Sequence, residues 1–171
     1  MVYFSVVLSR TEDGWDSNDI ELDEVESLTD LADAMREASG DEDAEGPWLL
    51  LLEQEDMWFA VVRVDGDDDP RVFISDRSAI EHSAYAEMLL EGIGEPDDEV
   101  VAELESEVED EEDDDTELDD GPVGDLEILA DQGTSAQALL DLCSGDGVLP
   151  SEALTVLAER AGAANALETV R

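Results

Sequence analysis

The chain has 171 residues, 42% of them hydrophobic, which is enough for one ordinary domain with a small appendage. It carries 51 acidic residues against 7 basic ones, all arginine, and its formal net charge is −44. Nucleic acids and anionic membranes are bound mainly by cationic side chains, so this charge argues against both as direct partners. The charge suits basic proteins as partners, through steered and salt-sensitive association, although a merely solvated acidic surface is the favoured explanation.

The predicted elements begin with a strand over residues 2–9, where apolar residues alternate between the two faces. Residues 15–22 form a weaker, acid-rich strand, whose charges suit an exposed sheet edge. Ser27 is an N-cap candidate for the helix that follows, because Leu28, Leu31, Ala32 and Met35 recur at helical spacing.

Residues 47–76 are the longest apolar block and read as three strands. Residues 48–52 are continuously apolar, as in a strand buried on both faces, and residues 57–64 are rich in β-branched and aromatic side chains. Residues 72–75 form the third strand, so two hairpins give an antiparallel meander. Asp76 caps a predicted helix over residues 77–91.

The predicted fold class is therefore α+β, an antiparallel sheet with the order β-β-α-β-β-β-α over residues 1–91. This order is similar to that of longin and roadblock-like interaction modules, and at the level of the fold it makes a free sheet edge or a homodimer face plausible. Residues 92–121, more than half acidic and without a base, are predicted to form a disordered acidic linker.

Residues 122–171 are predicted to form a small C-terminal helical subdomain. Residues 125–132 form one helix, Thr134 and Gln137 match a capping box for a second, and Pro150 fits the first position of a third. A unit of some 50 residues is marginal by itself, so we expect it either to dock on the first domain or to bind a partner.

Candidate metal and catalytic groups are sparse. One histidine and one cysteine cannot supply a usual zinc site, and the aspartates from Asp65 to Asp69 lack the residues of an EF-hand loop. His82 reads as an exposed helix residue and Cys143 as a buried small hydrophobe. The sequence therefore predicts no catalytic, cofactor or metal site.

Aromatic side chains in the central block are the candidates for contact with a partner. Trp48, Trp58 and Phe59 could anchor another protein, although aromatic residues in strands more often belong to the core. Arg63 and Arg71 flank an aspartate-rich turn, and local pairing with those aspartates is the expected explanation. No basic signal-peptide start and no apolar run of about 20 residues is present, so a cytoplasmic protein is expected.

Several stretches resemble one family. They are MVYFSVVLSRTEDGW, LLLLEQEDMWFAVVRVDGDDDPRVFISD, GDLEILADQGTSAQALLDLC and LPSEALTVLAERAG. They are similar to the actinobacterial tRNA adenosine deaminase-associated proteins, over nearly the whole chain. The resemblance implies a link to the enzyme that makes inosine at the tRNA wobble position. It assigns no activity and no site residue. The chain is not that enzyme, because His82 is followed by Ser83 and Ala84 and the H-x-E and P-C-x-x-C zinc signatures are absent.

Three functions are compatible with the sequence. The first is a non-enzymatic accessory protein that contacts the deaminase or another basic protein. The second is a nucleic-acid mimic or regulator that uses the acidic residues 92–121. The third, an enzyme or sensor with a pocket under the sheet, has no residue-level support.

Overall fold

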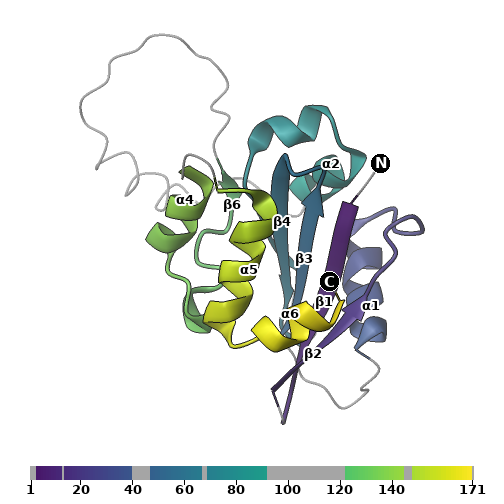
Figure 1. Cartoon of the computed structure of the whole chain (residues 1–171). Helices are drawn as coiled ribbons and strands as arrows, with labels where there is room; N and C mark the ends of the chain where they lie inside the picture. Colours follow the sequence, from purple (N-terminus) through teal and green to yellow (C-terminus); the bar gives the residue numbers. More distant parts are fainter. Residues whose placement is uncertain are drawn as a thin grey trace.

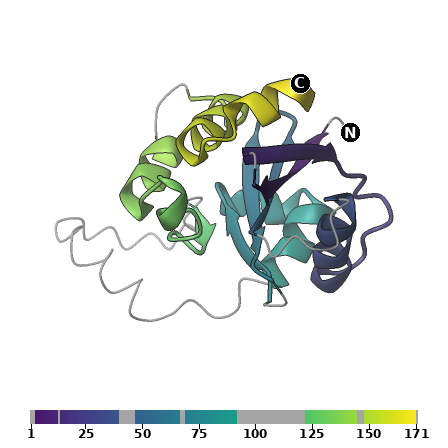
Figure 2. The ribbon, with the colours of Figure 1, turned by 90° about the horizontal axis from the view of Figure 1, so that it is seen from below.

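A computed structural model describes residues 3–12, 14–39, 47–66, 69–91, 122–144 and 148–170. These residues form an antiparallel sheet of six strands in the order β2-β1-β3-β4-β5-β6, with helices on both faces (Figures 1 and 2). The strands are β1 (Tyr3–Thr11), β2 (Gly14–Asp19), β3 (Trp48–Gln54), β4 (Trp58–Val64), β5 (Arg71–Ile74) and β6 (Val123–Gly124). The predicted mixed helix and antiparallel-sheet architecture is confirmed.

The two central strands β3 and β4 are buried on both faces of the sheet, because helices cover each face. In β3, Trp48, Leu50 and Leu52 enter one core, while Leu49 and Leu51 enter the other. Successive side chains in a strand point to opposite faces, so a continuous apolar run supplies both cores at once. The prediction for residues 48–52 is confirmed.

One face of the sheet is covered by α1 (Leu28–Ala38) and α2 (Ala84–Glu91). Ser27 begins α1 as predicted, because its Oγ accepts a first-turn backbone N–H at 3.2 Å. Leu31 and Met35 of the apolar stripe are fully buried against the sheet. Local capping and helical spacing therefore located this helix correctly.

The predicted helix over residues 77–91 is divided in the structure. A 3-10 helix, η1 (Arg77–Glu81), comes first, and Asp76 caps it by accepting the N–H of Ser78 at 2.8 Å. The α-helix begins only after Ser83, whose Oγ accepts the N–H of Ala86 at 3.5 Å. A serine whose side chain bonds to the backbone favours a helix start over a helix interior, which explains the division.

The opposite face of the sheet is covered by the C-terminal helices η2 (Ala130–Gln132), α4 (Ala136–Ser144), α5 (Pro150–Ala161) and α6 (Ala164–Val170). Of these, α5 lies against β3 and β4, and α6 lies against β1 and β2 (Figures 1 and 2). The C-terminal segment thus docks on the first 91 residues, one of the two outcomes expected from its small size. Pro150 occupies the first turn of α5 as predicted.

Two local predictions in the C-terminal segment are wrong. Residues 125–132 form turns and the short η2 instead of one helix. The hydroxyl that caps α4 belongs to Ser135, whose Oγ accepts the N–H of Ala138 at 3.2 Å, whereas Thr134 is fully buried. Gln137 donates instead to Asp141 one turn later, at 3.2 Å, so it completes no capping box.

The order of elements also differs from the predicted one. A 3-10 helix precedes α2, and β6 joins the sheet edge from the segment that was predicted to be wholly helical. The longin- and roadblock-like order is therefore not confirmed. The predicted acidic linker, residues 92–121, lies outside the described residues.

Candidate functional site

The three aromatic residues predicted as possible partner contacts are buried. Trp48 and Trp58 are each 4% exposed and lie in the core beneath α1 and α2. Phe59 is 2% exposed on the other face, with its ring centroid 6.1 Å from that of Phe73. Their packing fits the core role, and contact with a partner stays a prediction.

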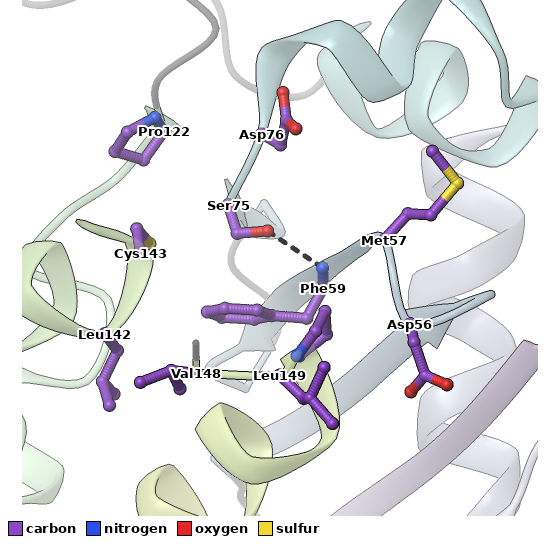
Figure 3. A pocket seen from close by; sticks show the side chains of 11 residues that line it. Asp56, Met57, Phe59, Ser75, Asp76, Pro122, Leu142, Cys143, Val148 and Leu149 are labelled. Atoms are coloured by element: carbon purple, nitrogen blue, oxygen red, sulfur yellow. Dashed lines mark hydrogen bonds between the residues drawn. The ribbon is translucent and has the colours of Figure 1, made fainter. Parts of the chain in front are cut away.

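Exposed apolar side chains gather elsewhere, around a pocket of about 290 Å³ (Figure 3). The large hydrophobic side chains that are exposed in the described part of the chain are Met57, Val148 and Leu149, at 67%, 40% and 49%. All three line this pocket, which we call the Met57 pocket. Single exposed hydrophobics are ordinary, but clustered ones mark binding surfaces.

Met57 is presented by the hairpin turn between β3 and β4. The N–H of Met57 donates to Gln54 O at 3.0 Å, and the two central residues, Glu55 and Asp56, have φ of 54° and 56°. Two positive φ values in a two-residue loop define a type I′ turn, for which Asn-Gly is the favoured sequence. Glu-Asp is a strained choice there, and Asp56 is one of the residues that line the pocket.

Val148 and Leu149 approach the pocket from the start of α5. Leu149 is the N-cap residue of this helix, and its N–H donates to the Glu152 carboxylate at 3.1 Å. A hydrocarbon side chain cannot return the second bond of a capping box, so the first turn of α5 lacks the acceptor that Ser or Thr would supply. An apolar residue therefore occupies a position where a polar one would stabilise the helix.

Replacing Leu149 by Ser is expected to stabilise the fold. The hydroxyl would accept the N–H of Glu152 and complete the capping box, and this gain is expected to exceed the loss of the half-buried leucine side chain. We expect Leu149→Ser to raise the free energy of unfolding by about 0.5–1 kcal/mol, measured by urea denaturation. A loss of stability would show that Leu149 contributes to the core more than its exposure indicates.

The floor of the Met57 pocket is formed where β4 begins and β5 ends. Phe59 and Ser75 are joined twice: Phe59 N–H donates to Ser75 Oγ and Ser75 N–H to Phe59 O, both at 2.9 Å. Cys143 of α4 also lines the pocket (Figure 3). Burial raises the pKa of the Cys143 thiol to about 12, so this sulfur stays protonated at neutral pH.

We expect the Cys143 thiol to react slowly with thiol reagents in the native protein. At pH 8 a thiol with a pKa near 12 holds about one ten-thousandth of its population as thiolate, the reactive form. When the chain is unfolded in urea, the rate of reaction with a disulfide reagent should rise by more than about tenfold. The thiol should then react about as fast as an ordinary exposed cysteine. Equal rates in both states would contradict the protonated, buried thiol.

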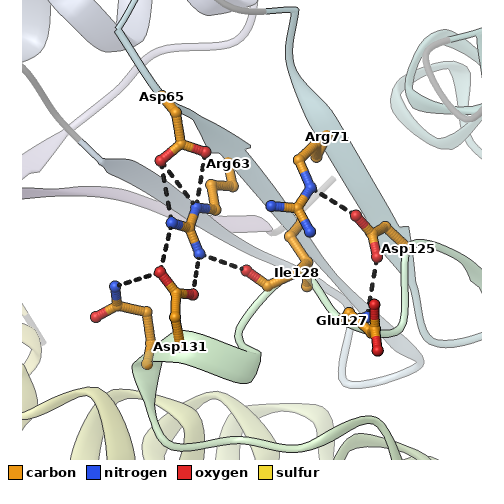
Figure 4. Close-up of polar contacts among 8 residues, drawn as sticks. Arg63, Asp65, Arg71, Asp125, Glu127, Ile128 and Asp131 are labelled. Atoms are coloured by element: carbon orange, nitrogen blue, oxygen red, sulfur yellow. Dashed lines mark hydrogen bonds and ion pairs between the residues drawn. The ribbon is translucent and has the colours of Figure 1, made fainter.

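Two arginines on the same face of the sheet hold the C-terminal segment (Figure 4). Arg63, 6% exposed, donates to Ile128 O at 2.9 Å, to Asp65 at 2.9 Å and to both carboxylate oxygens of Asp131. Arg71 donates to Asp125 at 2.5 Å. The local Arg63–Asp65 pairing is confirmed, but the other partners come from beyond residue 122.

The charges of this cluster shift each other's pKa. The hydrogen bond with Asp131 is the largest cause of the raised pKa of Arg63, against the opposing effect of its burial. The same bond lowers the pKa of Asp131 from its usual 3.8 to about 2, so the pair stays ionised at neutral pH. The cluster thus fixes β4 to η2, and through η2 it holds the C-terminal helices on the sheet.

The chain matches one known protein family over most of its length. The sequence pattern of the Rv3753c-like tRNA adenosine deaminase-associated protein family matches residues 3–164. The chain belongs to this family. No curated protein and no solved structure shows significant similarity to it. The family match covers β1 to β6 and α1 to α5, so it includes both sides of the Met57 pocket.

Three further features of the described residues bear on metal binding, catalysis and membrane insertion. These residues contain no group of three or more His, Cys, Asp or Glu side chains placed to hold a metal ion. His82 is exposed and borders a second cavity of only about 40 Å³. The described helices include none long and apolar enough to cross a membrane.

Sequence reasoning about this family member missed the exposed residues of the pocket, although Phe59, which it named as a possible partner contact, also lines the pocket. Met57 follows a hairpin turn, and Val148 and Leu149 precede a proline-started helix, so apolar residues in connecting segments were the available signal. Their meeting depends on how α4 and α5 dock on the sheet, which no local pattern encodes. Asp131 could not be singled out from the sequence either, because it is one of 51 acidic residues.

Proposed function

We propose that the chain is a non-enzymatic accessory protein that binds a tRNA adenosine deaminase and acts in the cytoplasm on the formation of wobble inosine. The observation that carries a binding role is the gathering of Met57, Val148 and Leu149 around one pocket. The family match over residues 3–164 supports the choice of partner, because the family is described by its association with that enzyme.

The geometry supports binding better than catalysis. The Met57 pocket is lined by apolar residues together with Ser75 and two acidic residues, Asp56 and Asp76, but neither histidine nor arginine lines it. Asp76 is engaged as the cap of η1, which leaves it little freedom to act as an acid or base. A surface of this kind holds a partner's side chain and offers no nucleophile with an activating base.

The test is co-purification of the full chain with the deaminase from native cells at low salt, with tRNA inosine measured in a strain lacking the chain. We expect a stoichiometric complex that weakens as salt is added, and a changed inosine content. The absence of a complex, together with an unchanged inosine content, would overturn the proposal.

The alternative function is that of a nucleic-acid mimic that competes with tRNA for the same deaminase. It depends on the acidic residues 92–121, which lie outside the described residues. Exchanging the acids of this segment for Gln and Asn in the full chain separates the two: a mimic would lose its competition with tRNA, whereas an accessory protein that binds through its folded part would keep the deaminase.

A further inference from the structure

The Met57 pocket combines two chemical features. Its exposed walls are the apolar side chains of Met57, Val148 and Leu149, and its charged members are the carboxylates of Asp56 and Asp76. No lining residue is basic. Its volume, about 290 Å³, is at the lower end of the range for small-ligand pockets, about 300–1,000 Å³. These properties fit a few side chains of a partner better than a cofactor.

We propose that the Met57 pocket binds a basic segment of the deaminase. An apolar side chain of that segment packs between Met57, Val148 and Leu149, and a neighbouring Arg or Lys lies beside Asp56 and Asp76. The identity of the partner rests on the proposed function. The chemistry of the segment rests on the charge of the pocket, which is complementary to cations.

Local choices that disfavour stability support this assignment. Asp56 holds φ at 56°, where Gly would be unstrained, and Leu149 stands at an N-cap where Ser would bond to the helix. Both residues line the pocket, and each presents the side chain that the proposed partner requires. Sites where a sequence breaks local rules are commonly functional ones.

Other occupants are disfavoured by charge. The chain's own residues 92–121 hold no base and would bring further carboxylates to Asp56 and Asp76. A second copy meets the same repulsion, since the formal net charge is −44. The second copy is an outcome of the test below.

The binding test uses variants of the full chain that are expected to fold at least as well as the parent. Leu149→Ser should weaken binding to the purified deaminase about tenfold, as removal of an interface anchor does, while Leu149→Met, which keeps an apolar side chain, should bind within about twofold. Asp56→Gly should slow association about threefold and reduce its salt dependence. Glu168→Gln on α6 is the charge-matched control, because Glu168 is exposed and does not line the pocket. It should change neither the affinity for the deaminase nor the rate of association.

The chemistry is tested separately with a peptide, Arg-Arg-Leu-Leu-Arg-Arg, blocked at both ends, and its counterpart with Glu in place of Arg. We expect the basic peptide alone to shift the methyl resonances of Met57 and Leu149. Equal shifts with both peptides, or none with either, would overturn the proposal.

The outcomes distinguish the two hypotheses. Binding of the deaminase that is unchanged in Leu149→Ser would overturn the pocket assignment and leave the proposed function standing. Absence of any deaminase binding, together with peptide shifts, would overturn the proposed function and leave the basic-segment site. A dimer of the purified chain in solution that Leu149→Ser dissociates would assign the pocket to a second copy and overturn the proposal.

Discussion

Replacing both Asp65 and Asp131 by Asn should lower the free energy of unfolding by about 3 kcal/mol. Arg63 is 6% exposed, so its guanidinium would keep a full charge with only neutral acceptors around it. Removing the partners of a buried charge costs roughly 3–5 kcal/mol, and the low end applies because 58% of the Asp131 side chain and 34% of the Asp65 side chain are exposed. The measurement is urea denaturation at pH 7.

A matched variant separates this effect from general relief of charge repulsion. Asp125→Asn with Glu127→Gln removes two charges from the same segment, and the Arg71–Asp125 pair that it weakens is a third exposed on each side. Exposed ion pairs contribute about 0–1 kcal/mol, so this variant should lose less than about 1 kcal/mol. Equal losses in the two double variants would show that the burial of Arg63 has no energetic consequence.

Acid titration supplies a second measurement on the same cluster. The folded pKa of Asp131 is about 2, below its usual 3.8, so its contribution is fully present above about pH 4 and is lost as the pH falls towards 2. The stability difference between the parent and Asp131→Asn should therefore shrink over that interval. The difference is the useful quantity, because acid also relieves repulsion among the many other carboxylates.

The parts of the fold that the sequence predicted are those decided by neighbouring residues. A continuous apolar run placed β3, and β-branched and aromatic residues placed β4, while the Ser27 hydroxyl and Pro150 located the starts of α1 and α5. Each of these signals lies within one strand or one helical turn, so it survives whatever the remainder of the chain does. The division of the helix after Ser83 and the cap at Ser135 were missed because adjacent residues offered equally good local choices.

The candidate site depends on tertiary structure, and of its residues only Phe59 was predicted as a possible partner contact. Arg63 and Asp131 are 68 residues apart in the sequence, and Met57 and Leu149 are brought together only when α5 packs on the sheet. The two residues of β6 are too few to give a strand pattern. Aromatic residues of the central strands drew attention as possible anchors, yet they fill the cores, and the exposed apolar residues lie in the connecting segments.

Gly124→Ala should lower the free energy of unfolding by about 3 kcal/mol, as much as the double replacement of Asp65 and Asp131. Gly124 has φ of 112°, and a Cβ at this position would overlap the carbonyl oxygen of Val72 in the neighbouring strand. Backbone strain of this kind costs about 1–3 kcal/mol, and separation of β6 from β5 would add the loss of its hydrogen bonds. Urea denaturation measures the total.

Gly162→Ala is the control that isolates the steric part of this effect. Gly162 ends α5 with φ of 83°, but nothing lies within 4 Å of its added Cβ, so only the left-handed backbone is penalised, by about 1–2 kcal/mol. Because Pro122 precedes β6 and lines the Met57 pocket, Gly124→Ala should also weaken deaminase binding, whereas Gly162→Ala should not. Equal destabilisation by the two substitutions would mean that β6 moves away from Val72 at no cost, and that this edge of the sheet does not help to fix the pocket.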